Sequence, residues 1–209
     1  MKKAVFYGDS NTYGYDPVNG HSGGRFTEDE RWTCILQKQT RREGQDWIIQ
    51  ENSAVGRCIP QLRFEMEELD ECLRQQCEGM FLFGILLGIN DHLSMPRPNP
   101  GRVGEKMSEL LDYLLKRFDS MDFRPVPRLL VIAPPPVDFT GDRFYEKFST
   151  TDGSLSGALK SAALKAGADF LDPAPWNLPL YSGDHIHLTR EGHRIFAENL
   201  GRELSVLYP

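Results

Sequence analysis

Four short segments of the sequence carry groups that nucleophilic catalysis requires. A nucleophilic serine needs a base to accept its proton, an acid to orient that base, and N–H donors for the oxyanion formed when a carbonyl is attacked. Ser10 supplies a hydroxyl, and Asp184 and His187 are three residues apart, so one turn can bring carboxylate and imidazole together. Asn90 offers a side-chain amide, and Gly56 offers a backbone N–H that no side chain screens.

Each segment also has an ordinary structural explanation when it is considered alone. The Gly-Asp-Ser-Asn stretch at 8–11 has the composition of a turn, and the Asn-Asp pair at 90–91 is typical of a turn or a helix cap. Asp184 and His187 are equally compatible with a surface pair. The chemical interpretation therefore depends on whether the fold brings the four segments together.

Strands and helices alternate along the chain. Apolar runs bounded by Gly, Pro or Asn predict strands, and apolar residues repeated every three or four positions predict helices. The strands are expected at 3–7, 47–50, 80–87, 129–133 and 169–171. The helices are expected at 27–42, where Thr27 and Glu30 form a capping-box pattern, and at 62–73, 103–118, 155–166 and 189–207.

This alternation predicts an α/β fold, with a parallel sheet covered by helices on both faces. Ligands of such sheets bind beyond the carboxyl ends of the strands. Three of the four segments follow the first three strands and the fourth precedes the last helix, so the topology can gather them at one rim. With 209 residues and no linker or internal repeat, the chain is expected to form one domain over 1–209.

The composition argues against several classes of protein. Hydrophobic residues make up 40% of the chain and charged residues 26%, and no apolar run approaches the roughly 18–20 residues that span a bilayer. The apolar run at 4–7 is too short for a signal peptide, so we expect a cytoplasmic protein without a membrane partner. The net charge of −6 argues against nucleic acid as a partner. The cysteines, which form no C-x-x-C motif, are expected to be free thiols: Cys34, Cys58, Cys72 and Cys77.

Taken together, the four segments resemble the four blocks of the SGNH hydrolases, also called GDSL-type esterases. The matching stretches are GDSN at Ser10, the glycine at Gly56, G-x-N-D at 88–91 and D-x-x-H at 184–187. The resemblance implies a three-layer α/β/α sandwich with a five-stranded parallel sheet of the flavodoxin-like kind, and neither a metal nor an organic cofactor. It also implies Ser10 as nucleophile, His187 as base, Asp184 as orienting acid, and an oxyanion hole made by Ser10, Gly56 and Asn90.

Within that family the first block, GDSNTYGYDP, is most similar to the arylesterase-like branch. The stretch at 51–57 also resembles this branch, although Ser53 and Cys58 depart from its usual Gly and Thr. The resemblance implies a serine esterase acting on small acyl esters. Alternatives that stay open are a carbohydrate O-acetylesterase, a thioesterase or lysophospholipase of the same fold, and a non-catalytic ligand-binding domain with a vestigial site. A small-molecule ester is the expected partner, and a homo-oligomer stays open.

Other residues invite competing assignments. Ser22 lies in a G-x-S-x-G match, but that motif needs a strand directly before the serine and a helix directly after it, and a turn-forming stretch precedes it here. His185 and His193 lack the spacing of a metal-binding pair, so we expect them to be exposed or structural. Asp9 is expected to brace the turn at Ser10, and Trp176 to lie in the core or a pocket wall.

Overall fold

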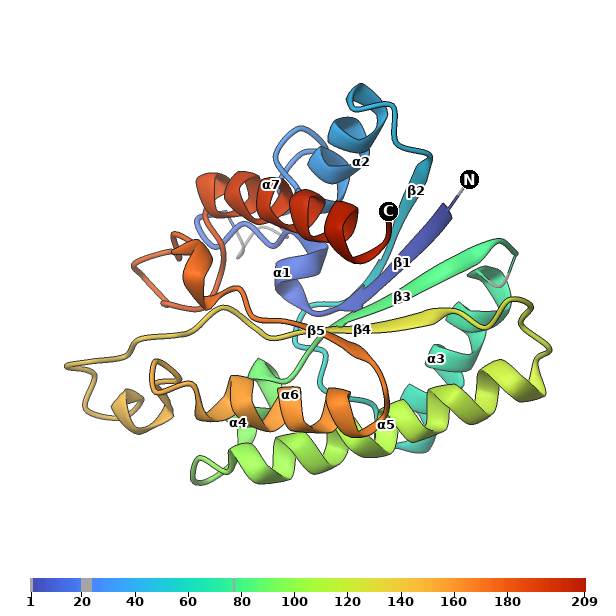
Figure 1. Cartoon of the computed structure of the whole chain (residues 1–209). Helices are drawn as coiled ribbons and strands as arrows, with labels where there is room; N and C mark the ends of the chain where they lie inside the picture. The colour runs from blue at the N-terminus through green and yellow to red at the C-terminus, as the bar shows by residue number, and fades with distance from the viewer. Residues whose placement is uncertain (1, 20–23, 77) are drawn as a thin grey trace.

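Five parallel strands form one sheet at the centre of the molecule. The computed structural model describes residues 2–19, 24–76 and 78–209. The strand order is β2-β1-β3-β4-β5, and Figure 1 shows the strands crossing the middle of the molecule. The predicted five-stranded parallel sheet is confirmed. The strands are β1 Lys2–Gly8, β2 Trp47–Ser53, β3 Met80–Leu86, β4 Arg128–Ile132 and β5 Asp169–Leu171.

Helices cover both faces of the sheet, as predicted (Figure 1). On one face lie α2 (Trp32–Arg42) and α7 (Arg190–Leu207), and on the other lie α3 (Arg63–Gln76), α5 (Pro100–Ser120) and α6 (Ser154–Lys165). β1 serves both layers because strand side chains alternate in direction. Ala4 and Phe6 pack in the α2/α7 core, whereas Val5 and Tyr7 pack in the other.

Two short helices begin directly after strands, where we expected only loops. α1 (Ser10–Tyr13) follows β1, and α4 (Ile89–Ser94) follows β3. Both are too short for a hydrophobic repeat to reveal them. Two 3₁₀ turns, η2 (Glu146–Phe148) and η3 (Ala174–Trp176), lie in the connections before α6 and α7.

Two of the predicted boundaries differ from the structure for reasons that the contacts show. The Glu30 half of the capping box forms, since the backbone N–H and the hydroxyl of Thr27 both donate to Glu30 Oε2, at 3.0 and 2.9 Å. It closes a separate turn, however, because Arg31 is extended and α2 begins only at Trp32. β2 continues past 50 to Ser53 because its polar end still pairs with β1, up to the Gly8–Ser53 pair. A strand at the sheet edge can carry such polar residues because it is only partly buried.

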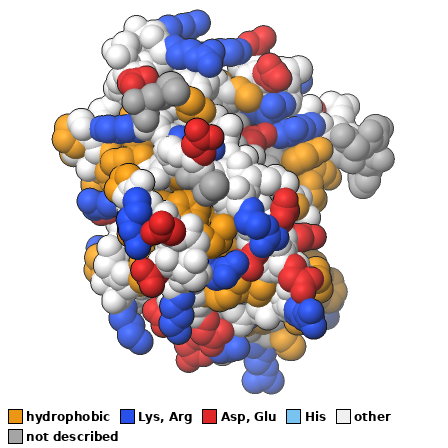
Figure 2. All heavy atoms as spheres, turned by 90° about the vertical axis from the view of Figure 1, so that its right-hand side faces the viewer, with side chains coloured by type: hydrophobic (Ala, Val, Ile, Leu, Met, Phe, Trp, Pro, Cys, Tyr) orange, Lys and Arg blue, Asp and Glu red, His pale blue; other side chains and the backbone are white. Residues whose placement is uncertain are grey.

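The surface at the amino ends of the strands carries side chains of several kinds. On the face drawn in Figure 2, acidic and basic side chains are interspersed, with hydrophobic side chains between them. Across the ranges that the structure describes, none of the helices combines the length and apolarity needed to cross a membrane.

Gly84 in β3 leaves room for a core aromatic ring and supplies a test of the packing. It pairs with Phe6 of β1, and a Cβ at Gly84 would lie 2.5 Å from Phe6 Cδ1. We expect Gly84→Ala to lower the free energy of unfolding by about 1–3 kcal/mol, because the fully buried ring must shift. Urea unfolding measures this.

Gly157→Ala is the matched control. In α6 the added Cβ meets no atom within 4 Å, so this change should raise stability by about 0.5–1 kcal/mol. Equal urea midpoints for Gly84→Ala and the native protein would contradict the packing argument.

Candidate active site

The four chemical segments meet at the carboxyl edge of the sheet. Ser10 begins α1 and is separated from the end of β1 by one residue, Asp9. Asn90 lies in the first turn of α4, just beyond β3. Gly56 lies in the loop between β2 and α3, and the fourth segment lies between η3 and α7. Because parallel strands all end at this edge, segments far apart in the sequence converge there.

Ser10, His187 and Asp184 form a continuous hydrogen-bonded chain. His187 Nε2 lies 3.0 Å from Ser10 Oγ, and His187 Nδ1 lies 2.8 Å from Asp184 Oδ2. If Nδ1 carries the proton and donates to the carboxylate, Nε2 is free to accept the serine proton. The arrangement can therefore activate Ser10 as a nucleophile.

The carboxylate of Asp184 is held in its ionised form. Its second oxygen, Oδ1, accepts the backbone N–H groups of Ile186 and His187, at 2.8 and 3.0 Å. Burial alone would raise the pKa of Asp184, but these N–H groups and the imidazole of His187 outweigh it and leave the pKa below its ordinary value. The same turn requires a left-handed backbone at His185, whose φ is 59°.

The turn that presents Ser10 depends on its two preceding residues. Asp9 Oδ1 accepts the backbone N–H of Asn11 at 2.9 Å, which is the bracing contact predicted for Asp9. Gly8 is needed because a Cβ there would lie 2.1 Å from Thr12 Oγ1. The Thr12 side chain thus packs directly over the end of β1, and Ser10 starts a helix immediately beyond the strand.

Gly56 and Asn90 are held beside one another by a direct contact between their segments. Asn90 Nδ2 donates to the carbonyl oxygen of Arg57, at 3.0 Å, and thereby ties α4 to the residue after Gly56. Gly56 itself has φ 76°, a left-handed conformation that L side chains rarely adopt. An amide nitrogen carries two protons, so one N–H of Asn90 remains to face a ligand.

Asp91, the next residue, makes two further contacts that strengthen this connection. It is completely buried, Oδ2 accepts the N–H of Ile59 at 2.8 Å, and Oδ1 pairs with Lys106 Nζ at 2.7 Å. A buried carboxylate is tolerated when it is paired and hydrogen-bonded in this way. The Asn-Asp pair therefore fastens the loop that carries Gly56, in addition to its place in α4.

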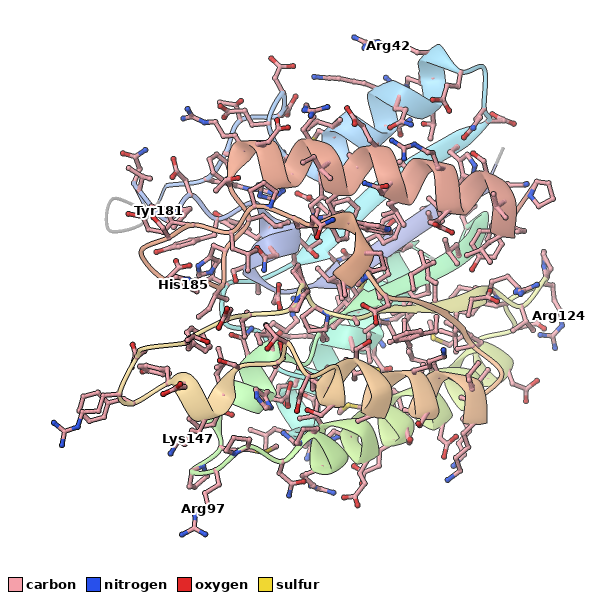
Figure 3. The ribbon with its side chains drawn as sticks, turned by 60° about the vertical axis from the view of Figure 1, so that its left-hand side comes forward. Arg42, Arg97, Arg124, Lys147, Tyr181 and His185 are labelled. Atoms are coloured by element: carbon pink, nitrogen blue, oxygen red, sulfur yellow. The ribbon has the colours of Figure 1, made fainter. Side chains whose placement is uncertain are left out.

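Aromatic side chains border His187 and its neighbours. The ring of Tyr15 lies 4.5 Å from that of His187, centroid to centroid. His185 is exposed, and its ring lies 6.3 Å from Phe139, in the connection between β4 and α6. Figure 3 shows His185 and Tyr181 on the segment that carries Asp184 and His187. The connection between β4 and α6 thus reaches the segment that carries Asp184 and His187.

Several other sequence candidates lie away from this chain of contacts. His193 is buried against Phe26, and burial lowers its pKa to about 3, so it is a neutral core residue. Trp176 packs on Phe196 of α7, with ring centroids 5.3 Å apart, and so lies against the core, as predicted. Ser22 lies outside the described residues.

Cys34, Cys58 and Cys72 are free thiols, as predicted, whereas Cys77 lies outside the described residues. No group of three His, Cys, Asp or Glu side chains within the described ranges is arranged to hold a metal ion.

Sequence reasoning missed two connecting residues. Asn11 bonds to the segment around His187, and Asp91 bonds to the loop after Gly56. Both were visible as neighbours of the predicted site residues, but nothing in the spacing indicated which distant backbone groups they would reach.

Comparison with known proteins gives a consistent family and fold. The sequence model of the GDSL-like Lipase/Acylhydrolase family matches residues 6–195. The structure of an aryl esterase from M. smegmatis is similar, with 25% identity and a TM-score of 0.80 over 99% of this chain and 100% of that one. The structure of Est24, a carbohydrate acetylesterase from Sinorhizobium meliloti, is similar at 24% identity, with a TM-score of 0.79 over 100% of both chains. Comparison with curated proteins found no match.

Asp9 supplies a pH-dependent test of the site. Burial raises the pKa of Asp9 to about 6, against the opposing effect of the Asn11 N–H. The unfolded chain binds the Asp9 proton less tightly than the folded chain, so ionisation of Asp9 weakens folding as the pH rises from about 4 to about 7. Asp9→Asn keeps an oxygen acceptor without the charge.

We therefore expect the melting temperature of Asp9→Asn, relative to the native protein, to increase from about pH 5 to about pH 8. The difference should correspond to about 1–2 kcal/mol. Thermal unfolding of both proteins at both pH values measures it. A constant difference, or one that shrinks at high pH, would contradict the raised pKa inferred for the buried carboxylate of Asp9.

Proposed function

The chain belongs to the GDSL-like lipase/acylhydrolase family and is a carboxylic ester hydrolase, and we propose that it cleaves small acyl esters through an acyl-enzyme on Ser10. The observation that carries this proposal is the chain of contacts from Ser10 Oγ to His187 Nε2, at 3.0 Å, and from His187 Nδ1 to Asp184, at 2.8 Å.

In the proposed first step, Ser10 Oγ forms a bond to the ester carbonyl carbon while its proton passes to His187 Nε2. The carbonyl oxygen becomes an oxyanion, which the N–H groups of Ser10, Gly56 and Asn90 stabilise. Asp184 stabilises the imidazolium. It can do so because its lowered pKa keeps its carboxylate ionised. The carbon–oxygen bond of the ester then breaks, and the departing alcohol takes the proton from His187.

In the second step, water replaces the alcohol. His187 accepts a proton from water as its oxygen attacks the acyl carbon, the bond to Ser10 Oγ breaks, and the proton returns to the serine. The acid leaves and the enzyme is restored. No other reactant is needed.

The substrate class is proposed from the names of two similar structures. The M. smegmatis relative is called an aryl esterase and the S. meliloti relative a carbohydrate acetylesterase. Both names fit a short acyl group attached to a larger alcohol, so we propose acetyl and other short-chain esters as substrates. A panel of aryl esters with increasing acyl length, together with acetylated sugars, distinguishes the alternatives: a preference for long acyl chains or thioesters would overturn the short-acyl proposal.

Substitution of the serine tests the mechanism. We expect Ser10→Ala to abolish both hydrolysis of a short-chain aryl ester and labelling by a fluorophosphonate, because the attacking oxygen is gone. Ser22→Ala should retain activity. The proposal is wrong if Ser22→Ala is inactive while Ser10→Ala is active, and a well-folded native protein that is never labelled would favour a vestigial, non-catalytic site.

The oxyanion hole has a separate test. Asn90→Ala should reduce kcat by about 10²–10³-fold, because a donor to the transition-state oxyanion is lost. Its melting temperature should be measured in parallel, since Asn90 also holds the carbonyl of Arg57. A change in KM alone, with kcat intact, would exclude Asn90 from oxyanion stabilisation.

A further inference from the structure

Asn11, the residue after Ser10, joins the two halves of the candidate site. Its side chain amide reaches both neighbours of His187: Nδ2 donates to the carbonyl oxygen of Ile186 at 3.2 Å, and Oδ1 accepts the N–H of Leu188 at 2.9 Å. These partners are 175 and 177 residues away in the sequence. One side chain thus connects the turn that carries the Ser10 hydroxyl to the segment that carries the His187 imidazole.

Asn11 is itself firmly placed. It is 3% exposed, and its backbone N–H donates to Asp9 Oδ1 at 2.9 Å. Its carbonyl oxygen accepts Nε1–H of Trp32 at 3.1 Å, and Trp32 is fully buried beneath α7. A displacement of residues 186–188 therefore cannot be followed by a compensating movement of Asn11 without breaking these contacts as well.

Other bonds of the His187 segment act within its own part of the chain. The N–H of Tyr181 donates to the carbonyl oxygen of His187 at 2.8 Å, and the N–H of Thr189 donates to that of Pro179 at 3.0 Å. Leu180 and Leu188 form an isolated antiparallel bridge. These contacts shape the segment 179–189, but they do not determine its distance from Ser10.

We propose that Asn11 is a positioning residue that sets the Ser10 Oγ–His187 Nε2 distance for proton transfer. The inference rests on the proposed function of these two residues. Its physical basis is that a buried amide with two fixed partners holds the backbone on both sides of His187 in place. A misplacement of the reacting groups by about 1 Å can lower the rate about 10²-fold. Proton transfer in the transition state is more sensitive to this distance than substrate binding is.

The chain contains a matched control for the loss of such a pair of hydrogen bonds. Gln37 of α2 makes the same pair of bonds to β2: Nε2 donates to the carbonyl oxygen of Trp47 at 3.0 Å, and Oε1 accepts the N–H of Ile49 at 2.8 Å. Residues 47–49 pair with residues 2–4 at the beginning of β1, whereas Ser10 follows the end of that strand. Gln37 thus makes the same kind of contact at the amino ends of the strands, opposite to the candidate site.

The experiment compares Asn11→Leu with Gln37→Met, each close in size to the residue replaced. Both changes leave two backbone groups unpaired, so both should lower the melting temperature. At a temperature where both variants are folded, we expect kcat of Asn11→Leu to fall about 10–100-fold with KM within about twofold, and fluorophosphonate labelling to slow in parallel. Gln37→Met should keep the native kcat, KM and labelling rate.

A purely structural role for Asn11 would give a different result. The inference is overturned if Asn11→Leu melts earlier but keeps kcat and the labelling rate within about twofold of the native protein, or if Gln37→Met loses as much kcat. If Asn11→Leu does not fold, Asn11→Ser decides, because its shorter side chain leaves room for a water and still cannot span both partners; full activity of that variant would overturn the inference.

Failure of this inference is distinguishable from failure of the proposed function. If the native protein is labelled at Ser10 and Asn11→Leu is labelled at the same rate, only the positioning role is lost. If the native protein is not labelled and does not hydrolyse esters, the proposed function fails first.

Discussion

The structure of the candidate site depends on the parallel direction of all five strands. Parallel pairing places every carboxyl end at one edge, so β1, β2 and β3 deliver Ser10, Gly56 and Asn90 to the same rim although they are tens of residues apart. The sheet determines which segments meet. It does not determine their separation to within the few tenths of an ångström that proton transfer needs, because each functional residue lies just beyond a strand.

Side-chain hydrogen bonds to distant backbone groups supply that finer level of positioning. Asn11 ties the Ser10 turn to the segment 186–188, and Asn90 with Asp91 tie α4 to residues 57 and 59. In each case a polar side chain at or next to a proposed catalytic residue bonds the backbone of a connecting segment. Asn11 and Asp91 are buried and Asn90 is partly buried, and their loss would leave backbone groups without partners. The site and the local stability of its loops therefore rest on the same contacts.

The sequence predicted the sheet, its helical layers and the residues that meet at the rim because each depends on local patterns. Buried strands are apolar runs, long helices repeat their apolar residues, and the four chemical segments occupy strand ends. Helix boundaries were harder to predict: Glu30 bonds Thr27 as a capping residue would, but the helix does not follow directly, because Arg31 is extended. The roles of Asn11 and Asp91 were not predictable from spacing, since their partners are chosen by tertiary packing.

Asp9 and Asp184 show why proximity in the sequence is a poor guide to the orienting acid. Asp9 is adjacent to Ser10, yet its carboxylate is turned to the N–H of Asn11, and burial raises its pKa to about 6. Asp184 is far away in the sequence, but it faces His187 and accepts two backbone N–H groups, which keep its pKa low despite burial. Only a carboxylate that stays ionised beside the ring can stabilise an imidazolium. The fold thus directs the neighbouring aspartate to a structural contact and places the distant one against the proposed base.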